Sequence, residues 1–355
     1  MDFNPKEPTS DNTGMFSLVR QVALEAERLK YDSIWLMDHL IQISGVTSSP
    51  LDPMMECWTT LSAISAITSK IRIGTLVTCN GFRHPAVLAK MASTVDNLSG
   101  GRLEFGLGAG WNKAEHDAYG ISFPNAAIRI QQLSESVQII KKMWTEKSPR
   151  FKGKYYSVNG AVCMPKPIQK PHPPIWIGGS GNYVLSVIAR HANGCNFWLP
   201  IDAYRSRLTV LEEHCTKYGR PAKSIIRSLS TRIAIGHTEE EANSRLDKFK
   251  SLDRQGLKHF LSQNINMAIR RPGRALSFLR GRVLGLGSSS HSTINGTPKD
   301  CVEALRKYLD LGVTHFMVQF PGSSDFESMR LFAEEVIPVM RESSSPSWRD
   351  DNAGP

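Results

Sequence analysis

The chain has 355 residues, of which 41% are hydrophobic, which is enough apolar material for one large α/β domain or two ordinary ones. It contains no run of about 18 apolar residues and its first eleven residues are polar, so the sequence predicts neither a membrane span nor a signal peptide and favours the cytoplasm. The formal net charge is +10, but the basic residues are scattered without a recognition motif, which favours an anionic cofactor or substrate over nucleic acid.

Helical and strand patterns alternate from the start of the chain, as is typical of β/α units around parallel strands. The first three units combine helices and strands, in chain order, at residues 15–30, 32–37, 56–68, 71–77, 85–98 and 102–107. A longer helix is expected at 128–144. Residues 151–162, where a glycine lies between aromatic and apolar residues, have the pattern of an inserted hairpin.

Five prolines between residues 165 and 174 predict an extended connector, because proline cannot continue a helix. After it the alternation resumes. Further strands are expected at 175–177, 195–199, 225–235 and 314–320, and further helices at 183–192, 203–218, 239–249, 298–311 and 326–340. Seven strands are therefore legible, which favours a (β/α)8 barrel over a doubly wound open sheet.

Two segments interrupt this regular pattern. Residues 250–296 lose the periodicity and become rich in glycine and serine, which predicts a mobile insertion. Residues 342–355 have the composition of a disordered tail. The rest of residues 1–341 is expected to form a single domain.

Two glycine-rich turns, at residues 106–111 and 177–182, each separate a short apolar run from a helical pattern. Glycines allow backbone N–H groups to approach a ligand closely, and the start of a helix favours an anion. A phosphorylated cofactor is the first ligand to expect. The first turn lacks the spacing and the position of a Rossmann fingerprint, which again favours the barrel.

Polar residues follow several of the strands, where a barrel carries its chemistry. Asp38 and His39 directly follow the strand at 32–37, although Asp38 can also cap the next segment and His39 can be an ordinary strand-end histidine. Trp111 is either a pocket wall or rim packing, and Glu115 with His116 can be solvated helix residues. The six cysteines lie far apart without metal-ligand spacing, which indicates buried thiols and no metal site.

In their order and spacing these segments resemble the bacterial luciferase-like monooxygenase superfamily, and within it the coenzyme F420-dependent oxidoreductases. The similar region runs from about residue 15 to 340. It includes Asp38-His39, residues 82–90, 100–102, 108–111, Glu115-His116, 165–167 and 177–179.

The resemblance implies a luciferase-like TIM barrel whose mouth holds the ring of coenzyme F420, or alternatively of FMN. It implies a cis peptide bond at Leu76-Val77 beneath the ring, a proton-transfer role for His39, and a place near the substrate for Glu115 and His116. The implied cofactor-binding residues are Asp38, His39, Leu76, Val77, Thr78, Asn80, Ala109, Gly110, Trp111, Gly178, Gly179, Ser180 and Gly181.

The sequence differs from such relatives at two places. They usually open with a strand that completes the barrel, whereas this chain reaches a helix by residue 15, so the first strand is short, altered or missing. Some deazaflavin dehydrogenases also place a carboxylate beside the glycine turn, where this chain has Trp111.

The leading hypothesis is an oxidoreductase that exchanges a hydride between reduced coenzyme F420 and a small organic substrate, and the resemblance implies a homodimer, because such barrels often dimerise through helices. The alternatives are an FMN-dependent monooxygenase that uses oxygen, and a flavin-binding barrel without turnover.

Overall fold

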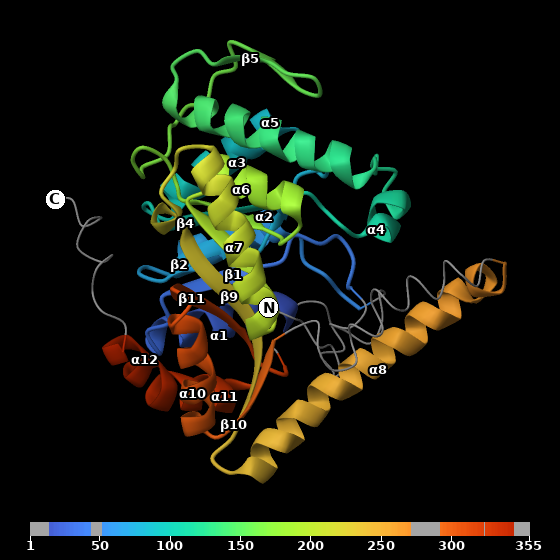
Figure 1. Ribbon diagram of the computed structural model, residues 1–355, viewed down its shortest axis with the longest axis vertical. Helices are drawn as coiled ribbons and strands as arrows, with labels where there is room; N and C mark the ends of the chain where they lie inside the picture. Colours follow the sequence, from blue (N-terminus) through green and yellow to red (C-terminus); the bar gives the residue numbers. More distant parts are fainter. Residues whose placement is uncertain (1–13, 44–51, 271–291, 323, 344–355) are drawn as a thin grey trace.

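The computed structural model describes residues 14–43, 52–270, 292–322 and 324–343, and it shows helices arranged around a curled parallel sheet (Figure 1). Nine of the described strands form this sheet in the order β1-β2-β4-β7-β8-β9-β10, with β3 paired to β4 and β11 paired to β9. All of these pairings are parallel. Parallel strands that alternate with helices agree with the α/β barrel expected from the sequence.

The first half of the sheet follows the predicted units closely. Its elements are α1 (Gly14–Arg28), β1 (Ser33–Leu36), α2 (Cys57–Ile67), β2 (Arg72–Thr75), β3 (Thr78–Cys79), α3 (Pro85–Leu98) and β4 (Leu103–Gly108). Glu56 caps α2 by accepting from the Trp58 and Thr59 amides, and His84 caps α3 just before Pro85. The expected strand at 71–77 is interrupted, because the cis peptide bond at Leu76-Val77 separates β2 from β3.

The middle of the chain contains the expected hairpin outside the main sheet. Its elements are α4 (Lys113–Ala118), α5 (Ala126–Thr145), β5 (Arg150–Lys152), β6 (Ser157–Asn159) and β7 (Ile175–Gly178). β5 and β6 pair only with each other, antiparallel, and lie beyond α5 at the edge of the molecule (Figure 1). The short helix α4 follows the glycine-rich turn at 106–111, where the sequence shows a helical pattern.

The second half completes the sheet. It comprises α6 (Asn182–His191), β8 (Gly194–Phe197), α7 (Ile201–Lys217), a 3-10 turn (Ala222–Ser224), β9 (Ile226–Ile235), α8 (Glu239–Arg270), β10 (Thr293–Gly296), α10 (Pro298–Leu309), β11 (Val313–Gln319), α11 (Phe326–Leu331), a π-helical turn (Phe332–Val336) and α12 (Ile337–Ser343).

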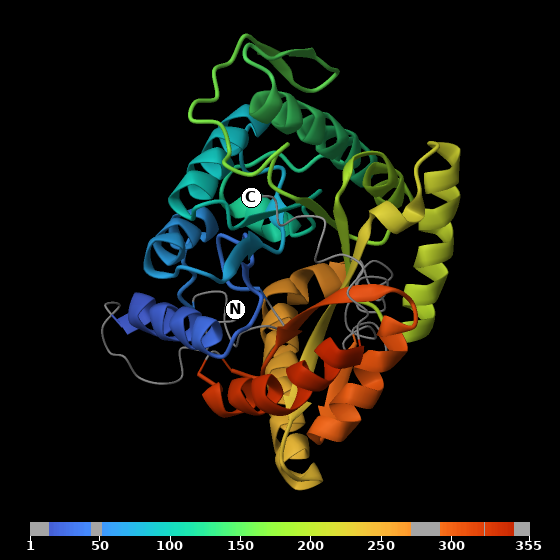
Figure 2. The same ribbon diagram turned by 90° about the vertical axis from the view of Figure 1, so that its left-hand side faces the viewer.

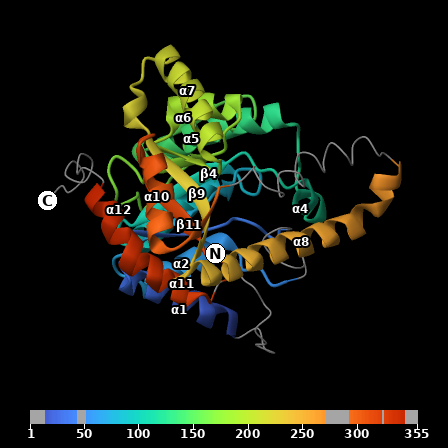
Figure 3. The ribbon, with the colours of Figure 1, turned by 60° about the horizontal axis from the view of Figure 1, so that its bottom comes forward.

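The expected boundaries of the mobile insertion at 250–296 are wrong. Helix α8 does not end near residue 249 but continues to Arg270, and residues 293–296 form β10. Residues 250–270 contain no proline and many good helix formers, and one glycine does not end a helix. Figures 1 and 3 show α8 projecting away from the barrel. Residues 271–291 lie outside the described residues, as does the expected tail beyond Ser343, where α12 ends.

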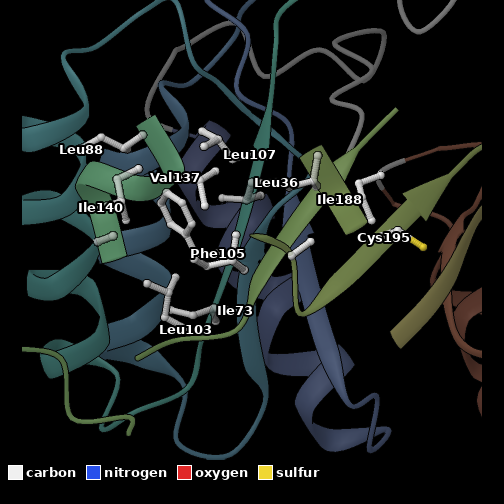
Figure 4. Packing of buried hydrophobic residues seen from close by; sticks show 14 of the residues in the cluster. Leu36, Ile73, Leu88, Leu103, Phe105, Leu107, Val137, Ile140, Ile188 and Cys195 are labelled. Carbon is white, nitrogen blue, oxygen red and sulfur yellow. The ribbon is translucent and has the colours of Figure 1, made fainter. Parts of the chain in front are cut away.

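The core is formed by residues of the sheet and of the helices that surround it, whose arrangement Figure 2 shows. Strand residues such as Leu103 and Phe105 pack beneath Leu88 of α3 and Ile140 of α5, and all four are at most 1% exposed (Figure 4). Rings of Trp58 and Trp144 also contact Phe105. This packing fixes the strands, and with them the residues that follow each strand.

Strands β1 and β11 each have a single partner among the described strands. Among the described strands, β1 pairs only with β2, and β11 pairs only with β9. The expectation of a short, altered or missing first strand concerns residues 1–13, which lie outside the described residues.

Candidate functional site

A cavity of about 730 Å3 lies among the residues that follow the strands. Such cavities at the carboxyl ends of parallel strands are where α/β barrels carry their chemistry. Most of the residues singled out in the sequence line it. They are Asp38, His39, Leu76, Val77, Thr78, Ala109, Gly110, Trp111, Glu115, His116, Gly178, Gly179 and Ser180.

Asn80 and Gly181 are not among the lining residues. The Asn80 side chain is 3% exposed and its amide lies 3.4 Å from the Tyr156 hydroxyl, toward the hairpin. Gly181 is the N-cap of α6 and lies one residue beyond the lining. Sequence reasoning also missed lining residues such as Trp198, which directly follows β8 and could have been found from that position.

The peptide bond between Leu76 and Val77 is cis, as the resemblance implied. Val77 lies on the floor of the cavity, against strand-end glycines of β4 and β7. A β-carbon at Gly108 would lie 2.7 Å from Val77 Cγ2, and one at Gly178 would lie 3.1 Å from Val77 Cγ1. The bare glycine backbones therefore leave the space that Val77 fills.

Asp38 is 2% exposed and belongs to an ion-pair network. Its carboxylate accepts two hydrogen bonds from Arg83, at 2.6 and 3.0 Å, and one from the Cys79 amide at 2.9 Å. Arg83 also pairs with Glu56. Burial raises the pKa of Asp38 above its ordinary value, and the hydrogen bonds and charge of Arg83 offset part of that increase. Through these hydrogen bonds Asp38 joins the segment after β1 to Arg83 and to the backbone at Cys79.

His39 lies at the cavity in contact with Glu115. The His39 Nδ1 atom is 2.9 Å from Glu115 Oε2, although the two residues are 76 positions apart. Glu115 is 1% exposed and also accepts the Leu40 amide and, at 3.2 Å, the Ile41 amide. The buried carboxylate therefore binds the segment that follows β1 from its position on α4.

Trp111 stands beside His39 at the mouth. The two rings are 5.6 Å apart between centroids, in an edge-to-face arrangement, and Trp111 is 47% exposed. An aromatic ring that is half exposed and lines a cavity is a wall rather than core packing.

His116, the next residue of α4, is also buried. Its Nδ1 atom lies 2.9 Å from the Asn112 carbonyl oxygen, and its ring contacts those of Phe82 and Phe123. Its Nε2 atom lies 3.7 Å from the Cys79 thiol, whose pKa burial raises to about 12. Cys79 is consequently a protonated thiol at neutral pH, and the pair packs the cavity wall.

The start of α6 faces the cavity through Gly178, Gly179 and Ser180. Gly179 has a φ of +118°, a conformation that favours glycine. Gly181 precedes the helix and forms no side-chain cap, so the first amides of α6 are not satisfied by a capping group. Unpaired amides at the start of a helix attract an anion such as phosphate.

The described residues contain no group of three or more His, Cys, Asp or Glu side chains arranged to hold a metal ion. Across the same residues, no helix is both long and apolar enough to span a membrane.

Fold and site together define an α/β barrel whose strand ends enclose a cavity beside a glycine-rich helix start. The sequence model of the family described as luciferase-like monooxygenase matches residues 3–315, and the chain belongs to this family of oxidoreductases. A curated relative, described as an F420-dependent glucose-6-phosphate dehydrogenase from Microbacterium testaceum, is 27% identical over 323 residues, which cover 89% of this chain and 91% of the relative.

Solved structures confirm the luciferase-like barrel fold. An F420-dependent secondary alcohol dehydrogenase superposes with a TM-score of 0.72 at 18% identity, covering 92% of this chain and 96% of the other. A long-chain alkane monooxygenase superposes with a TM-score of 0.76 at 16% identity, covering 93% and 84%.

Proposed function

We propose that this protein is a coenzyme F420-dependent oxidoreductase that exchanges a hydride with a small organic substrate. One observation carries the proposal. A single cavity combines a floor formed by Val77 with the start of α6, where no side chain caps the helix. The curated relative that is described as F420-dependent supports the deazaflavin over FMN.

The residues present fit such a cofactor. A volume of about 730 Å3 is within the usual range for small-molecule and cofactor sites. The bare backbone at Gly108 and Gly178 lets Val77 form a smooth floor for a ring. Next to it, Ser180 and the first amides of α6 offer hydrogen-bond donors to a phosphate.

When bound, the deazaflavin supplies the ring carbon that gives or accepts the hydride. The protein's own contribution is to orient the partners and to move a proton. In this proposal His39 exchanges a proton with the substrate oxygen, and Trp111 closes the side of the substrate space. Asp38 holds the segment that carries His39 through its bonds to Arg83 and the Cys79 amide.

The first test is a titration of the purified protein with coenzyme F420 and with FMN, followed by tryptophan fluorescence, since Trp35 and Trp111 both line the cavity. We expect preferential binding of coenzyme F420 and its reduction by members of an alcohol panel. We expect His39→Ala to lower turnover by roughly 100-fold while cofactor affinity stays largely unchanged. A parallel loss of binding would make His39 a binding residue instead.

The family description supports a second candidate, an FMN-dependent monooxygenase. Preference for FMN, with oxygen consumed in the presence of reduced FMN, would establish that function. Tight cofactor binding without turnover over a broad panel would favour a flavin-binding barrel. A small-molecule substrate, a cytoplasmic location and a homodimer complete the proposal, and sedimentation of the purified protein tests the last.

A further inference from the structure

We propose that Glu115 is a positioning residue that fixes both the orientation and the tautomer of His39, rather than a group that contacts the substrate. The inference deepens the proposed function and rests on it, because it assigns to His39 Nε2 the proton that the reaction moves. Its structural part, the tautomer of His39, can be measured without any cofactor.

Both carboxylate oxygens of Glu115 form hydrogen bonds with groups of the protein itself. Oε2 meets His39 Nδ1 at 2.9 Å, while Oε1 accepts both the Leu40 and the Ile41 amides. With 1% of Glu115 exposed, its carboxylate has three donors within reach and little contact with solvent. These hydrogen bonds fix the Glu115 carboxylate and the segment after β1 relative to each other.

This geometry determines which ring nitrogen of His39 carries the proton in the neutral form. A carboxylate only accepts hydrogen bonds, so Nδ1 must be the N–H that faces Oε2. The Nε2 atom on the other side of the ring is then an acceptor. Within the part of the chain that the structure describes, no hydrogen bond to Nε2 is formed. Nε2 is therefore the atom that takes a proton from a substrate hydroxyl, or returns one to a carbonyl oxygen.

The other ionisable side chains near His39 interact with other partners. Asp38 is bound by Arg83, which also pairs with Glu56, and His116 contacts the Asn112 carbonyl and the Cys79 thiol. Among the described residues, Glu115 is the charged group in direct contact with His39. It also becomes the counter-charge of the imidazolium when Nε2 is protonated.

Helix α4 links this pair to the glycine turn. It begins directly after the lining residues Gly110, Trp111 and Asn112, and its Tyr119 hydroxyl donates to the Leu40 carbonyl oxygen at 3.2 Å. The same short helix thus binds the segment after β1 at two points. Tyr119 provides a matched control, because its hydrogen bond can be removed without changing Glu115 or His39.

The variant Glu115→Gln keeps the shape of the side chain but changes its hydrogen bond to His39. The glutamine oxygen is best placed to accept the two backbone amides, which turns its NH2 group toward His39 Nδ1. Nδ1 then has to accept, and the proton moves to Nε2. We expect the 15N chemical shifts of labelled histidine to report the Nδ1–H tautomer in the wild type and in Tyr119→Phe, and the Nε2–H tautomer in Glu115→Gln.

Kinetics provide the second measurement. Because a misplaced proton removes the base, we expect Glu115→Gln to lower kcat at least ~100-fold with KM and F420 affinity little changed, and Tyr119→Phe to retain wild-type kcat. An Nε2–H tautomer in the wild type, an unchanged tautomer in Glu115→Gln, or a loss confined to F420 affinity would each overturn the inference. Absence of F420 turnover in the wild type would instead overturn the proposed function, while the tautomer measurement still decides the role of Glu115.

Discussion

Val77 fills the space that a side chain at Gly108 would need. A β-carbon at Gly108 would lie 2.7 Å from Val77 Cγ2, which is closer than side-chain carbons pack. Gly108 ends β4 and Val77 follows the cis peptide bond that separates β2 from β3. The floor of the cavity therefore depends on the size of one residue on a neighbouring strand.

Replacement of this glycine should disturb cofactor binding. We expect Gly108→Ala to displace Val77, to cost about 1–3 kcal/mol of stability, and to weaken F420 binding by tenfold or more. Fluorescence titration and thermal unfolding measure both effects. Gly322 lines the same cavity but has nothing within 4 Å of its would-be β-carbon, so Gly322→Ala is the matched control and should bind normally. Equal effects of the two substitutions would contradict this account.

The Asp38–Arg83 ion pair should be costly to break from one side. Asp38 is 2% exposed, so Arg83→Met leaves a buried carboxylate without its guanidinium partner. We expect a loss of about 3–5 kcal/mol in the free energy of unfolding, measured with urea. The double variant Asp38→Asn/Arg83→Met should recover part of this loss, because no charge is then stranded. Additive losses from the two substitutions would show that the pair is not coupled.

His191 should make stability depend on pH below neutrality. Burial, with help from Arg190, lowers the pKa of this α6 histidine from 6.5 to about 4. Between these values the unfolded chain binds a proton that the folded chain does not. Its contribution to stability is therefore complete above about pH 6.5 and is lost as the pH falls toward 4. We expect up to about 2 kcal/mol of loss between pH 7 and 5, and a flatter profile in His191→Gln. Parallel profiles for the two proteins would refute this assignment.

Local signals in the sequence were sufficient for much of the fold. The helix expected at 85–98 has the same limits as α3, because Pro85 and the cap at His84 mark its start and the apolar spacing carries it to Leu98. The hairpin and the proline connector could likewise be predicted, from residues that favour turns and from prolines that cannot continue a helix. The end of α8 was not, because residues 250–270 lack the strong periodicity from which a helix is recognised, yet nothing in them stops one.

The site was predictable in position but not in its contacts. Strand ends and glycine turns located the cavity, since these features follow directly from the β/α pattern. The contact between His39 and Glu115 joins residues 76 positions apart, and only the curvature of the sheet with the short helix α4 brings them together. Asn80 is the opposite case. It lies close to Thr78 in the chain, but its side chain contacts Tyr156 and does not line the cavity.

The cavity is lined by residues of the strands β1 and β11 themselves as well as by residues that follow the strands. Successive residues of a strand point to opposite sides of the sheet, yet both Ile34 and Trp35 of β1, and both Met317 and Val318 of β11, line the cavity. Ala26 of α1, which packs behind the sheet, lines it as well. A bulkier residue at position 26 would therefore reduce the space available to a ligand from the side of α1.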